Sequence, residues 1–427
     1  MNISAVTSSH MGFKGLEKKN DSNVANIAVV GGGGRIGRNA TRQYLLAKHA
    51  PSGVYNSWDA LSEIYKNQNL VAINMGSMGL KGGKTIADVE NEDIIAQLTT
   101  DSILGKLPDS INMKVVRIND DTLLQVSSEK GGNELIKLVA TRDDVDFSDV
   151  KADIVIDTTG ARTSKAAMQG LKESAKVKYA LLSAPSKEKD KSVEPMPTIV
   201  SGVNNERIKD IDASGGVASA ASCTTTCISP IIKLVNDTFG VKNGYIETVH
   251  AATATQFTAD KTKSTADSKA RNSFDSMIPT TTGAAKAVGL VLPELKGKLD
   301  GTATRVPTAD GSMAVITLNL NKNTNVDEVK AVLKAAEKDP AYKNLIAEAP
   351  KGSSSRDVIG RHESALYVPE SIKVIDGNML VIKAYYDNEF GYTRSLMSLS
   401  HDVSDKVIMD KKKEEDMNLE HCHKIIS

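Results

Sequence analysis

The sequence predicts an α/β protein in which a Rossmann-type, doubly wound parallel sheet is followed by an α+β domain with an antiparallel sheet. A glycine run lies between a short apolar strand pattern and a helix pattern near the start of the chain. Strand and helix patterns then alternate over the first half, whereas the second half is rich in strands. A chain of 427 residues is long enough for two domains, each with its own core.

The chain carries 53 basic and 53 acidic side chains, so its formal net charge is zero. This balance gives no electrostatic reason to expect nucleic acid or a membrane as a partner, and any phosphate would be bound locally. Three cysteines do not form a disulfide framework and are typical of a reducing compartment, so we expect a cytoplasmic protein. No apolar run is long enough to suggest a membrane span.

The glycine run follows a polar N-terminal extension, Met1–Ala25, which lacks the apolar core of a signal peptide and is expected to be disordered. Asn26–Val30 is the predicted first strand. Gly32, Gly34 and Gly37 follow it with G-x-G-x-x-G spacing. These glycines allow a tight turn, a close approach of the backbone to a pyrophosphate, and close packing of helix on strand. The phosphates would lie at the N-terminus of the next helix.

A segment from about His49 to Asn69 lengthens the connection after this helix. It contains Trp58, the single tryptophan, and Trp58–Tyr65 reads as a short helix. We expect this insertion to be an addition to the surface.

The second strand, Leu70–Asn74, ends where an acidic residue would bind the ribose hydroxyls of a dinucleotide. The sequence has Met75 there, which removes the acceptor for the diol of NAD and also the charge that would repel the 2′-phosphate of NADP. Hydroxyl and cationic side chains follow at Ser77, Lys81 and Lys84. We therefore expect NAD or NADP as cofactor, with NADP capability favoured on charge grounds. A solvated loop that never contacts the cofactor is the alternative.

Two further strands of buried type, Ala152–Asp157 and Tyr179–Ser183, belong to the predicted parallel sheet. Thr159 and Gly160 follow the first, and Ser183 ends the second. Because ligands of such sheets bind beyond the carboxyl ends of the strands, these residues lie at the expected cofactor edge. Ordinary turn chemistry is the alternative explanation for them.

The second half is organised around Cys223, which lies between a run of small residues and an apolar helix pattern over Ile228–Phe239. We predict that Cys223 lies at the mouth of this helix, where unpaired N–H groups and the macrodipole favour the thiolate. His250 ends a strand pattern, Tyr245–Val249, that would direct its imidazole at the cysteine as a general base. A buried structural cysteine and a histidine that is merely hydrogen-bonded are the alternatives.

Five motifs occur in order along the chain: Ser222–Thr225, Thr248–Ala251, Thr282–Gly289, Arg305–Thr308 and Tyr386–Tyr392. Together they resemble the phosphorylating glyceraldehyde-3-phosphate dehydrogenase family, with the strongest similarity after Ser222. The resemblance implies four segments beyond the extension. These are a dinucleotide-binding domain at 26–221, a catalytic domain at 222–386, a closing helix at 387–405 that returns to the first domain, and a charged tail at 406–427.

The resemblance also implies a reaction, the oxidative phosphorylation of glyceraldehyde 3-phosphate to 1,3-bisphosphoglycerate. The Cys223 thiolate would add to the aldehyde of this phosphorylated substrate, and His250 would remove the hydroxyl proton. Hydride would then pass to the nicotinamide, which Asn388 would orient with Tyr392 nearby. Inorganic phosphate would cleave the resulting thioester.

The remaining binding residues also follow from the resemblance. The implied cofactor-binding residues are Gly32, Gly34, Arg35, Ile36, Gly37, Met75, Thr159, Gly160, Ser183, Asn388 and Tyr392. Thr253 and Arg305 would hold the substrate phosphate. The attacking phosphate would be bound by Ser222, Thr224, Arg271, Thr282 and Gly283. Hydroxyls and arginine hold anions without a metal, so no metal is expected, and the terminal His421–His423 segment is expected to be inert.

The polar loop between His250 and Ile278 has too few apolar residues for a core, and the resemblance implies that it packs across an interface of a homotetramer. Thr226 replaces the asparagine that the family has beside the nucleophile, and Lys261–Thr262 replaces a pair such as Leu-Pro found in NAD-using relatives. Two alternatives therefore stay open: a dehydrogenase of the erythrose-4-phosphate type, and a cofactor-binding pseudoenzyme or scaffold.

Overall fold

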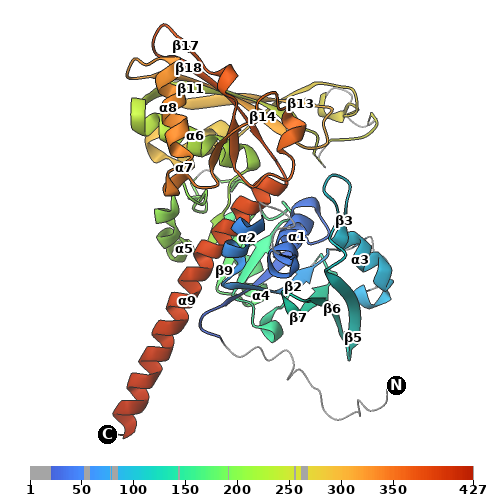
Figure 1. The fold of residues 1–427 in the computed structure, drawn as a ribbon. Coiled ribbons are helices and arrows are strands. Elements are labelled where there is room, and N and C mark those ends of the chain that lie inside the picture. The colour runs from blue at the N-terminus through green and yellow to red at the C-terminus, as the bar shows by residue number, and fades with distance from the viewer. Residues whose placement is uncertain are drawn as a thin grey trace.

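The computed structural model describes residues 21–51, 58–76, 78, 85–142, 145–190, 192–253, 256–260 and 268–426. These residues form two bodies, one above the other in Figure 1, each built on its own large sheet. The predicted disordered extension lies outside the described residues as far as position 20, and Ala25 already begins the first strand. Among the described helices, none has both the length and the apolar character that crossing a membrane requires.

The first sheet has eight strands in the order β10-β9-β8-β1-β2-β7-β6-β5. The strands from β10 to β7 are parallel, and β6 and β5 extend the edge through antiparallel pairs. The strand bounds are β1 (Ala25–Val30), β2 (Gln68–Asn74), β5 (Asn112–Ile118), β6 (Asp121–Ser128), β7 (Gly132–Val139), β8 (Ile154–Asp157), β9 (Tyr179–Leu182) and β10 (Val217–Ser219). A two-stranded pair, β3 (Thr100–Asp101) and β4 (Gly105–Lys106), stands apart.

Helices cover both faces of this sheet. Side chains of α1, α2, α3 and α9 join the buried cluster on one face, and those of α4 join the cluster on the other. The helix bounds in this part are α1 (Arg35–His49), α2 (Trp58–Tyr65), α3 (Asn91–Thr99), α4 (Lys165–Ala175) and α5 (Asp210–Ala213). The prediction of a doubly wound, mostly parallel sheet is confirmed.

The second sheet runs in the order β12-β13-β11-β14-β18-β16-β15, with β17 also paired to β18. Most pairs are antiparallel, as predicted, but β11 with β13 and β15 with β16 are parallel, so the sheet is mixed. The strands are β11 (Val241–Ala251), β12 (Ile278–Thr281), β13 (Leu299–Val306), β14 (Ser312–Leu320), β15 (Ile346–Glu348), β16 (Ala365–Tyr367), β17 (Lys373–Ile375) and β18 (Met379–Tyr386). The helices α6 (Cys223–Phe239), α7 (Ala284–Val291) and α8 (Val326–Ala336) contribute to its core.

The helix that carries the cysteine begins earlier than the apolar pattern indicated. α6 starts at Cys223, directly after the N-cap Ser222, so Pro230 lies in the helix interior rather than in its first turn. After Cys223, the first turn of α6 consists of polar threonines, so a pattern based on apolar residues does not include it. Only three residues separate β10 of the first sheet from α6 of the second body. The domain boundary at residue 222 stays a prediction.

The inserted helix α2 is part of the core, and the prediction that it is an addition to the surface is wrong. Leu61 and Tyr65 are fully buried, and the Tyr65 ring meets that of Tyr44 edge to face, with 5.7 Å between the centroids. Leu61, Ile64 and Tyr65 recur at the spacing of one helix face, which packs against α1 and α9.

The last helix, α9 (Phe390–Ile426), is longer than predicted. Its first half packs on the first sheet through residues such as Leu396 and Val403, as expected of the closing helix at 387–405. The helix then continues to Ile426, through the predicted charged tail, instead of ending near residue 405. Lysine and glutamate favour helix, and ion pairs such as Lys406 with Asp212, at 2.7 Å, hold this continuation to the body.

Candidate active site

Cys223 and His250 meet at the N-terminal end of α6. The Cys223 Sγ lies 3.4 Å from the His250 Nε2. The cysteine begins α6, which follows the edge strand of the first sheet, and the histidine lies near the end of β11 in the second sheet. The two sheets therefore bring together a thiol and an imidazole that lie 27 residues apart in the chain.

The turn that leads into Cys223 is strained and tightly capped. Ala221 has a φ of 60°, in the left-handed region that alanine rarely adopts. Ser222 is the N-cap of α6, and its Oγ accepts a hydrogen bond of 3.1 Å from the Thr225 N–H. This turn fixes the sulfur at the first position of the helix.

The thiol of Cys223 does not follow the expectation of a favoured thiolate. Burial raises its pKa, while the charge of Arg305 and hydrogen bonds from Thr224 act in the opposite direction. The direction differs from the sequence prediction because desolvation outweighs the helix terminus and the nearby cation. A resting thiol needs a base to accept its proton.

His250 is suited to accept that proton. Burial and the neighbouring Arg305 charge lower its pKa to about 4, so the ring is neutral near pH 7. Its Nδ1 lies 2.8 Å from the Ala251 carbonyl oxygen and 2.5 Å from an Arg305 guanidinium nitrogen, while its Nε2 faces Cys223. Arg305 donates to the same carbonyl at 3.0 Å, which places a guanidinium beside the pair.

Tyr386 is a buried part of this site that the sequence did not single out. Its hydroxyl lies 2.8 Å from both the Thr224 and the Thr248 hydroxyls, and its ring meets that of His250 edge to face at 5.9 Å. Thr224, predicted to bind the attacking phosphate, therefore directs its hydroxyl at Tyr386. The tyrosine belonged to a recognised motif, but an aromatic residue at a strand end carries no signal of this contact.

The N-termini of α6 and α7 lie next to each other. The Ser222 Oγ is 2.8 Å from the Thr225 hydroxyl, which in turn lies 3.5 Å from the carbonyl oxygen of Ala284 in α7. The Thr282 hydroxyl accepts from the N–H of Ala284, the first residue of α7, at 3.1 Å. A Cβ added to Gly283 would meet no atom within 4 Å, so its backbone borders open space. Two helix N-termini with hydroxyls between them can bind an anion.

The glycine loop after β1 has the close contacts that a dinucleotide site needs. A Cβ on Gly32 would come within 2.2 Å of the Ile73 side chain, and one on Gly37 within 2.3 Å of the Gly31 oxygen. The first turn of α1 has no side-chain cap and no acidic residue, so its N–H groups remain for an anion. The loop residues thus fit a pyrophosphate. The predicted residues of this loop are Gly32, Gly34, Arg35, Ile36 and Gly37.

The ends of β8 and β9 lie beside this loop. A Cβ on Gly31 would come within 3.0 Å of the Thr159 side chain. Gly160 has a φ of 67°, and the Ser183 N–H donates to the Asp157 oxygen at 2.9 Å across the two strand ends. Thr159, Gly160 and Ser183 are therefore at the carboxyl edge of the sheet, where such folds bind ligands.

Met75 lies at the end of β2, but its side chain packs in the core. It is 3% exposed, and its sulfur lies 3.6 Å from the position that a Cβ on Gly32 would take. The side chain thus lies beneath the glycine loop and offers no polar group to a ribose. Ser77, Lys81 and Lys84, which were expected to supply donors and a cation, lie outside the described residues.

Asn388 and Tyr392 are hydrogen-bonded to the backbone beside His250 and Cys223, Asn388 through the Ser312 hydroxyl and Tyr392 directly. The Ser312 hydroxyl donates to the Asn388 Oδ1 at 2.6 Å and accepts from the N–H of Ala251, next to His250, at 3.0 Å. This leaves the amide Nδ2 of Asn388 as its donor. The Tyr392 hydroxyl donates to the Ala221 oxygen at 3.3 Å.

Arg35 joins the two bodies, a role that the sequence did not reveal. It begins α1 directly after the glycine loop, donates to the Ala309 oxygen at 3.0 Å and to the Ala252 oxygen at 3.4 Å, and forms an ion pair with Glu389. These partners come from loops that follow β11, β13 and β18. The nucleotide loop is therefore attached to the segment that carries Asn388.

A buried pair of carboxyl groups, Asp310 and Asp387, lies in the same region. Both side chains are 2% exposed and hydrogen-bonded to each other. Asp387 accepts from the N–H groups of Gly360 and Phe390, at 2.7 Å each, and so caps α9. Burial and the mutual charge raise the pKa of Asp310 in particular, so the pair retains a proton.

Two predicted phosphate-binding residues remain separate from these contacts. Thr253 follows β11 by two residues, and its N–H donates to the Gln256 side chain at 3.0 Å. Arg271 is paired with Asp260 at 2.6 Å in a largely exposed position, and no described contact brings it to Cys223. The Lys261–Thr262 pair lies outside the described residues.

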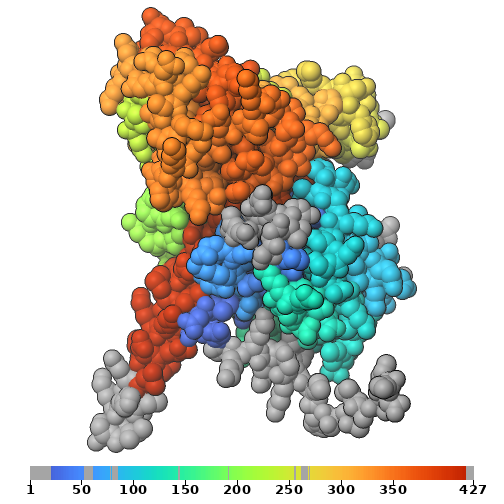
Figure 2. Space-filling view, in the orientation of Figure 1, coloured from blue at the N-terminus to red at the C-terminus, as the bar shows by residue number. Residues whose placement is uncertain are grey.

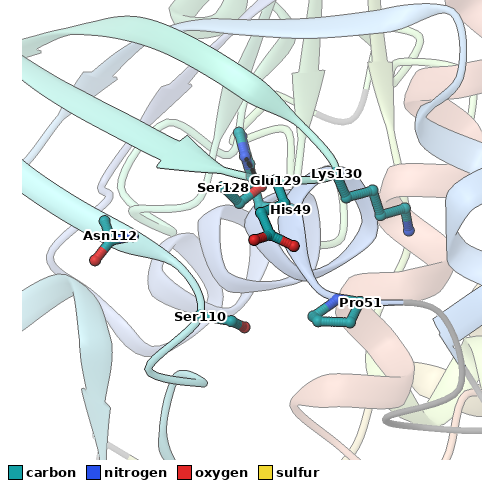
Figure 3. A pocket seen from close by; sticks show the side chains of 7 residues that line it. All are labelled: His49, Pro51, Ser110, Asn112, Ser128, Glu129 and Lys130. Atoms are coloured by element: carbon teal, nitrogen blue, oxygen red, sulfur yellow. Dashed lines mark hydrogen bonds between the residues drawn. The ribbon is translucent and has the colours of Figure 1, made fainter.

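A described cavity of about 610 Å³ lies elsewhere, between the end of α1 and β5 and β6, and contains none of the predicted site residues (Figure 3). His49 lies in it with both ring nitrogens paired, one with Ser128 and one with Glu134, at 3.0 Å each. Among the side chains that the structure describes, no group of three histidine, cysteine or acidic residues gathers as metal ligands.

A Rossmann-type sheet joined to a second sheet, with a cysteine, a histidine and an arginine where the two meet, is an arrangement typical of dinucleotide-dependent dehydrogenases. A family model for the glyceraldehyde 3-phosphate dehydrogenase C-terminal domain matches residues 222–388. The chain belongs to the glyceraldehyde-3-phosphate dehydrogenase family.

Relatives of this name match most of the chain. The glyceraldehyde-3-phosphate dehydrogenase of Mycolicibacterium smegmatis is 34% identical over 373 residues, which cover 87% of this chain and 96% of the relative. Glyceraldehyde-3-phosphate dehydrogenase 1 of Bacillus cereus is 35% identical over 380 residues, 88% of this chain and 98% of the relative. The enzyme of the same name from Caenorhabditis elegans is 37% identical over 287 residues, 66% of this chain and 80% of the relative.

Proposed function

We propose that the protein oxidises glyceraldehyde 3-phosphate with NAD or NADP and phosphorylates it to 1,3-bisphosphoglycerate through a thioester on Cys223. The single observation that carries this proposal is the 3.4 Å contact between Cys223 Sγ and His250 Nε2 at a helix N-terminus. A neutral imidazole beside a thiol is the arrangement for adding sulfur to an aldehyde carbon.

The proton steps follow from the contacts of His250. Nε2 accepts the Cys223 proton as sulfur attacks the carbonyl carbon, and it returns this proton to the alkoxide formed, which gives a thiohemiacetal. His250 then removes the hydroxyl proton as hydride leaves carbon. The dinucleotide, when bound, supplies the nicotinamide ring that accepts this hydride. Tyr386 and the Ala251 carbonyl hold the imidazole in place during both proton transfers.

Two anions are held on opposite sides of the sulfur in this proposal. Arg305, already beside His250, holds the phosphate of the substrate together with Thr253. The paired N-termini of α6 and α7, with Ser222 and Thr282, hold the inorganic phosphate that attacks the thioester. Thr224 contributes its N–H here, since its hydroxyl contacts Tyr386. Arg271 is retained as a further phosphate ligand from the family resemblance alone.

The cofactor residues fit a dinucleotide on the evidence of the glycine loop. Gly32, Gly34, Arg35, Ile36 and Gly37 hold the pyrophosphate, and Thr159, Gly160 and Ser183 line the nicotinamide half. Asn388 donates its Nδ2 to the carboxamide, beside Tyr392. We favour NADP capability because Met75 brings no carboxylate to the ribose.

The assembly is proposed as a homotetramer. Phe274 and Met277, in the loop before β12, are 71% and 75% exposed, which supports an interface there. The cytoplasmic location expected from cysteine usage stays a prediction.

The test measures reduction of NAD and of NADP separately, by absorbance, with glyceraldehyde 3-phosphate and inorganic phosphate. We expect turnover that requires phosphate, more NADP use than a carboxylate at position 75 would allow, and loss of turnover in Cys223→Ser. A protein that binds the cofactor but gives no turnover with this aldehyde or with erythrose 4-phosphate would contradict the proposal and favour a scaffold. Faster turnover of erythrose 4-phosphate would correct the substrate.

A further inference from the structure

The second half of α9 extends beyond the body of the protein. Figure 1 shows the helix leaving the first sheet and ending far from both bodies, and Figure 2 shows it standing free on the same side. The last side-chain contacts with the body are those of Asp410 with Lys178, at 2.8 Å, and of Lys411 with Asp153, at 2.7 Å. The described side chains at 412–419 are all exposed, and no hydrogen bond or ion pair links them to the body.

The last described turns of α9, from Met409 onward, carry exposed apolar side chains. Met409, Met417 and Leu419 are 56%, 62% and 58% exposed, and they lie within 11 residues of one helix. Among the other exposed large apolar side chains, Phe274 and Met277 lie together in the loop before β12, and the rest are scattered over loops and strands of both bodies. A local group of exposed apolar residues on a projecting helix marks an interaction surface.

Four of the described residues define a seam along this helix: Met409, Lys412, Asp416 and Leu419. They are spaced by three, four and three residues, which is the spacing of one contact stripe between paired helices. The seam therefore reads apolar, cationic, anionic, apolar in chain order. In the reverse direction the order is apolar, anionic, cationic, apolar. Two copies of the seam in opposite directions therefore set each lysine against an aspartate and each apolar residue against an apolar residue.

We infer that this seam pairs with the same seam of a second copy of the chain, with the two helices antiparallel. Met409 then lies opposite Leu419 of the other copy, and Lys412 lies opposite its Asp416. The two-fold symmetry of such a contact produces each pairing twice. The interface buries four apolar side chains at its ends and forms two ion pairs at its centre.

The charge pattern selects this occupant over others. A parallel pair would set Lys412 against Lys412 and Asp416 against Asp416, which repel. Lys412 and Asp416 form no ion pair within one helix in the structure, and lysine placed before the acid is the weaker order for such a pair. The basic run 411–413 is followed by the acidic run 414–416, so the surface has no net charge to attract an anionic membrane or nucleic acid.

The contact is short, about 16 Å of helix, so it is weak by itself and adds to any assembly formed through other surfaces. Sedimentation velocity of the full chain over a range of concentrations measures it. The Lys412→Glu variant would place two acids opposite each other at each pair. We expect roughly tenfold weaker association, because both ion pairs become repulsive. The double variant Lys412→Glu/Asp416→Lys restores opposite charges and is expected to restore wild-type association.

Disulfide trapping tests the register. The Met409→Cys and Leu419→Cys variants, each also carrying Cys422→Ser, are oxidised separately and as a mixture. We expect cross-linked dimers to form faster in the mixture than in either variant alone, because position 409 faces 419. Circular dichroism checks that every variant keeps its helix. Equal association of wild type and Lys412→Glu, no rescue by the double variant, or faster cross-linking of a single variant with itself would each overturn the inference.

Discussion

Replacing Asp310 by asparagine tests whether the carboxyl pair with Asp387 shares a proton. Asp387 accepts two backbone N–H bonds of 2.7 Å and is the ionised partner, so Asp310 holds the proton that lies between them. In the unfolded chain Asp310 ionises near pH 4. Between about pH 4 and the raised native pKa of Asp310, the native state therefore binds one proton more than the unfolded state. Unfolding free energy must then fall as pH rises through this range.

The magnitude follows from one proton. Each pH unit in this window costs the wild type about 1.4 kcal/mol, or about 3 kcal/mol between pH 5 and pH 7. In Asp310→Asn the amide donates the same hydrogen bond without titrating, so this contribution to the slope disappears. Urea unfolding at pH 5, 6 and 7 measures the difference between variant and wild type. The matched control is Asp300→Asn, an exposed carboxylate paired weakly with Lys286 at 3.6 Å, which is expected to leave the slope unchanged. Parallel slopes for Asp310→Asn and the wild type would refute the shared proton.

Three other outcomes are expected. Thr226→Val removes a buried hydroxyl that has no described hydrogen-bond partner, so the free energy of unfolding in urea should stay equal or rise by about 1 kcal/mol, and a loss above about 1 kcal/mol would contradict this. Leu61→Ala in the inserted helix should lower that free energy by about 2–5 kcal/mol, since Leu61 is fully buried, whereas a neutral result would show that the helix is peripheral. The acid limb of kcat/KM should titrate near the His250 pKa of about 4, not near the ordinary histidine value of about 6.5, because the ring is buried beside Arg305.

The sequence predicted the pieces of the site that depend on local pattern. The glycine spacing placed Gly32 and Gly37 at the strand-to-helix turn, and the strand pattern before His250 placed that residue at the end of a strand. The contact between Cys223 and His250 was inferred from chemistry, because sequence order does not state which residues meet. The 3.4 Å distance confirms that they meet.

Other features were hidden because they depend on tertiary contacts. Thr224 is predicted to bind phosphate, but its hydroxyl already contacts the Tyr386 hydroxyl at 2.8 Å. Met75 was interpreted by the charge that it lacks, whereas its burial follows from packing under the glycine loop. The inserted α2 was judged by its position in a connection, although the apolar face of Leu61 and Tyr65 indicated a buried helix.

Arg35 connects the two bodies of the protein. The residue that opens the phosphate-facing helix is bonded to three loops of the other body, including the turn that carries Asn388. A pyrophosphate arriving at that helix competes with Glu389 for one guanidinium. Binding of a pyrophosphate there would therefore change the contacts of the turn that carries Asn388.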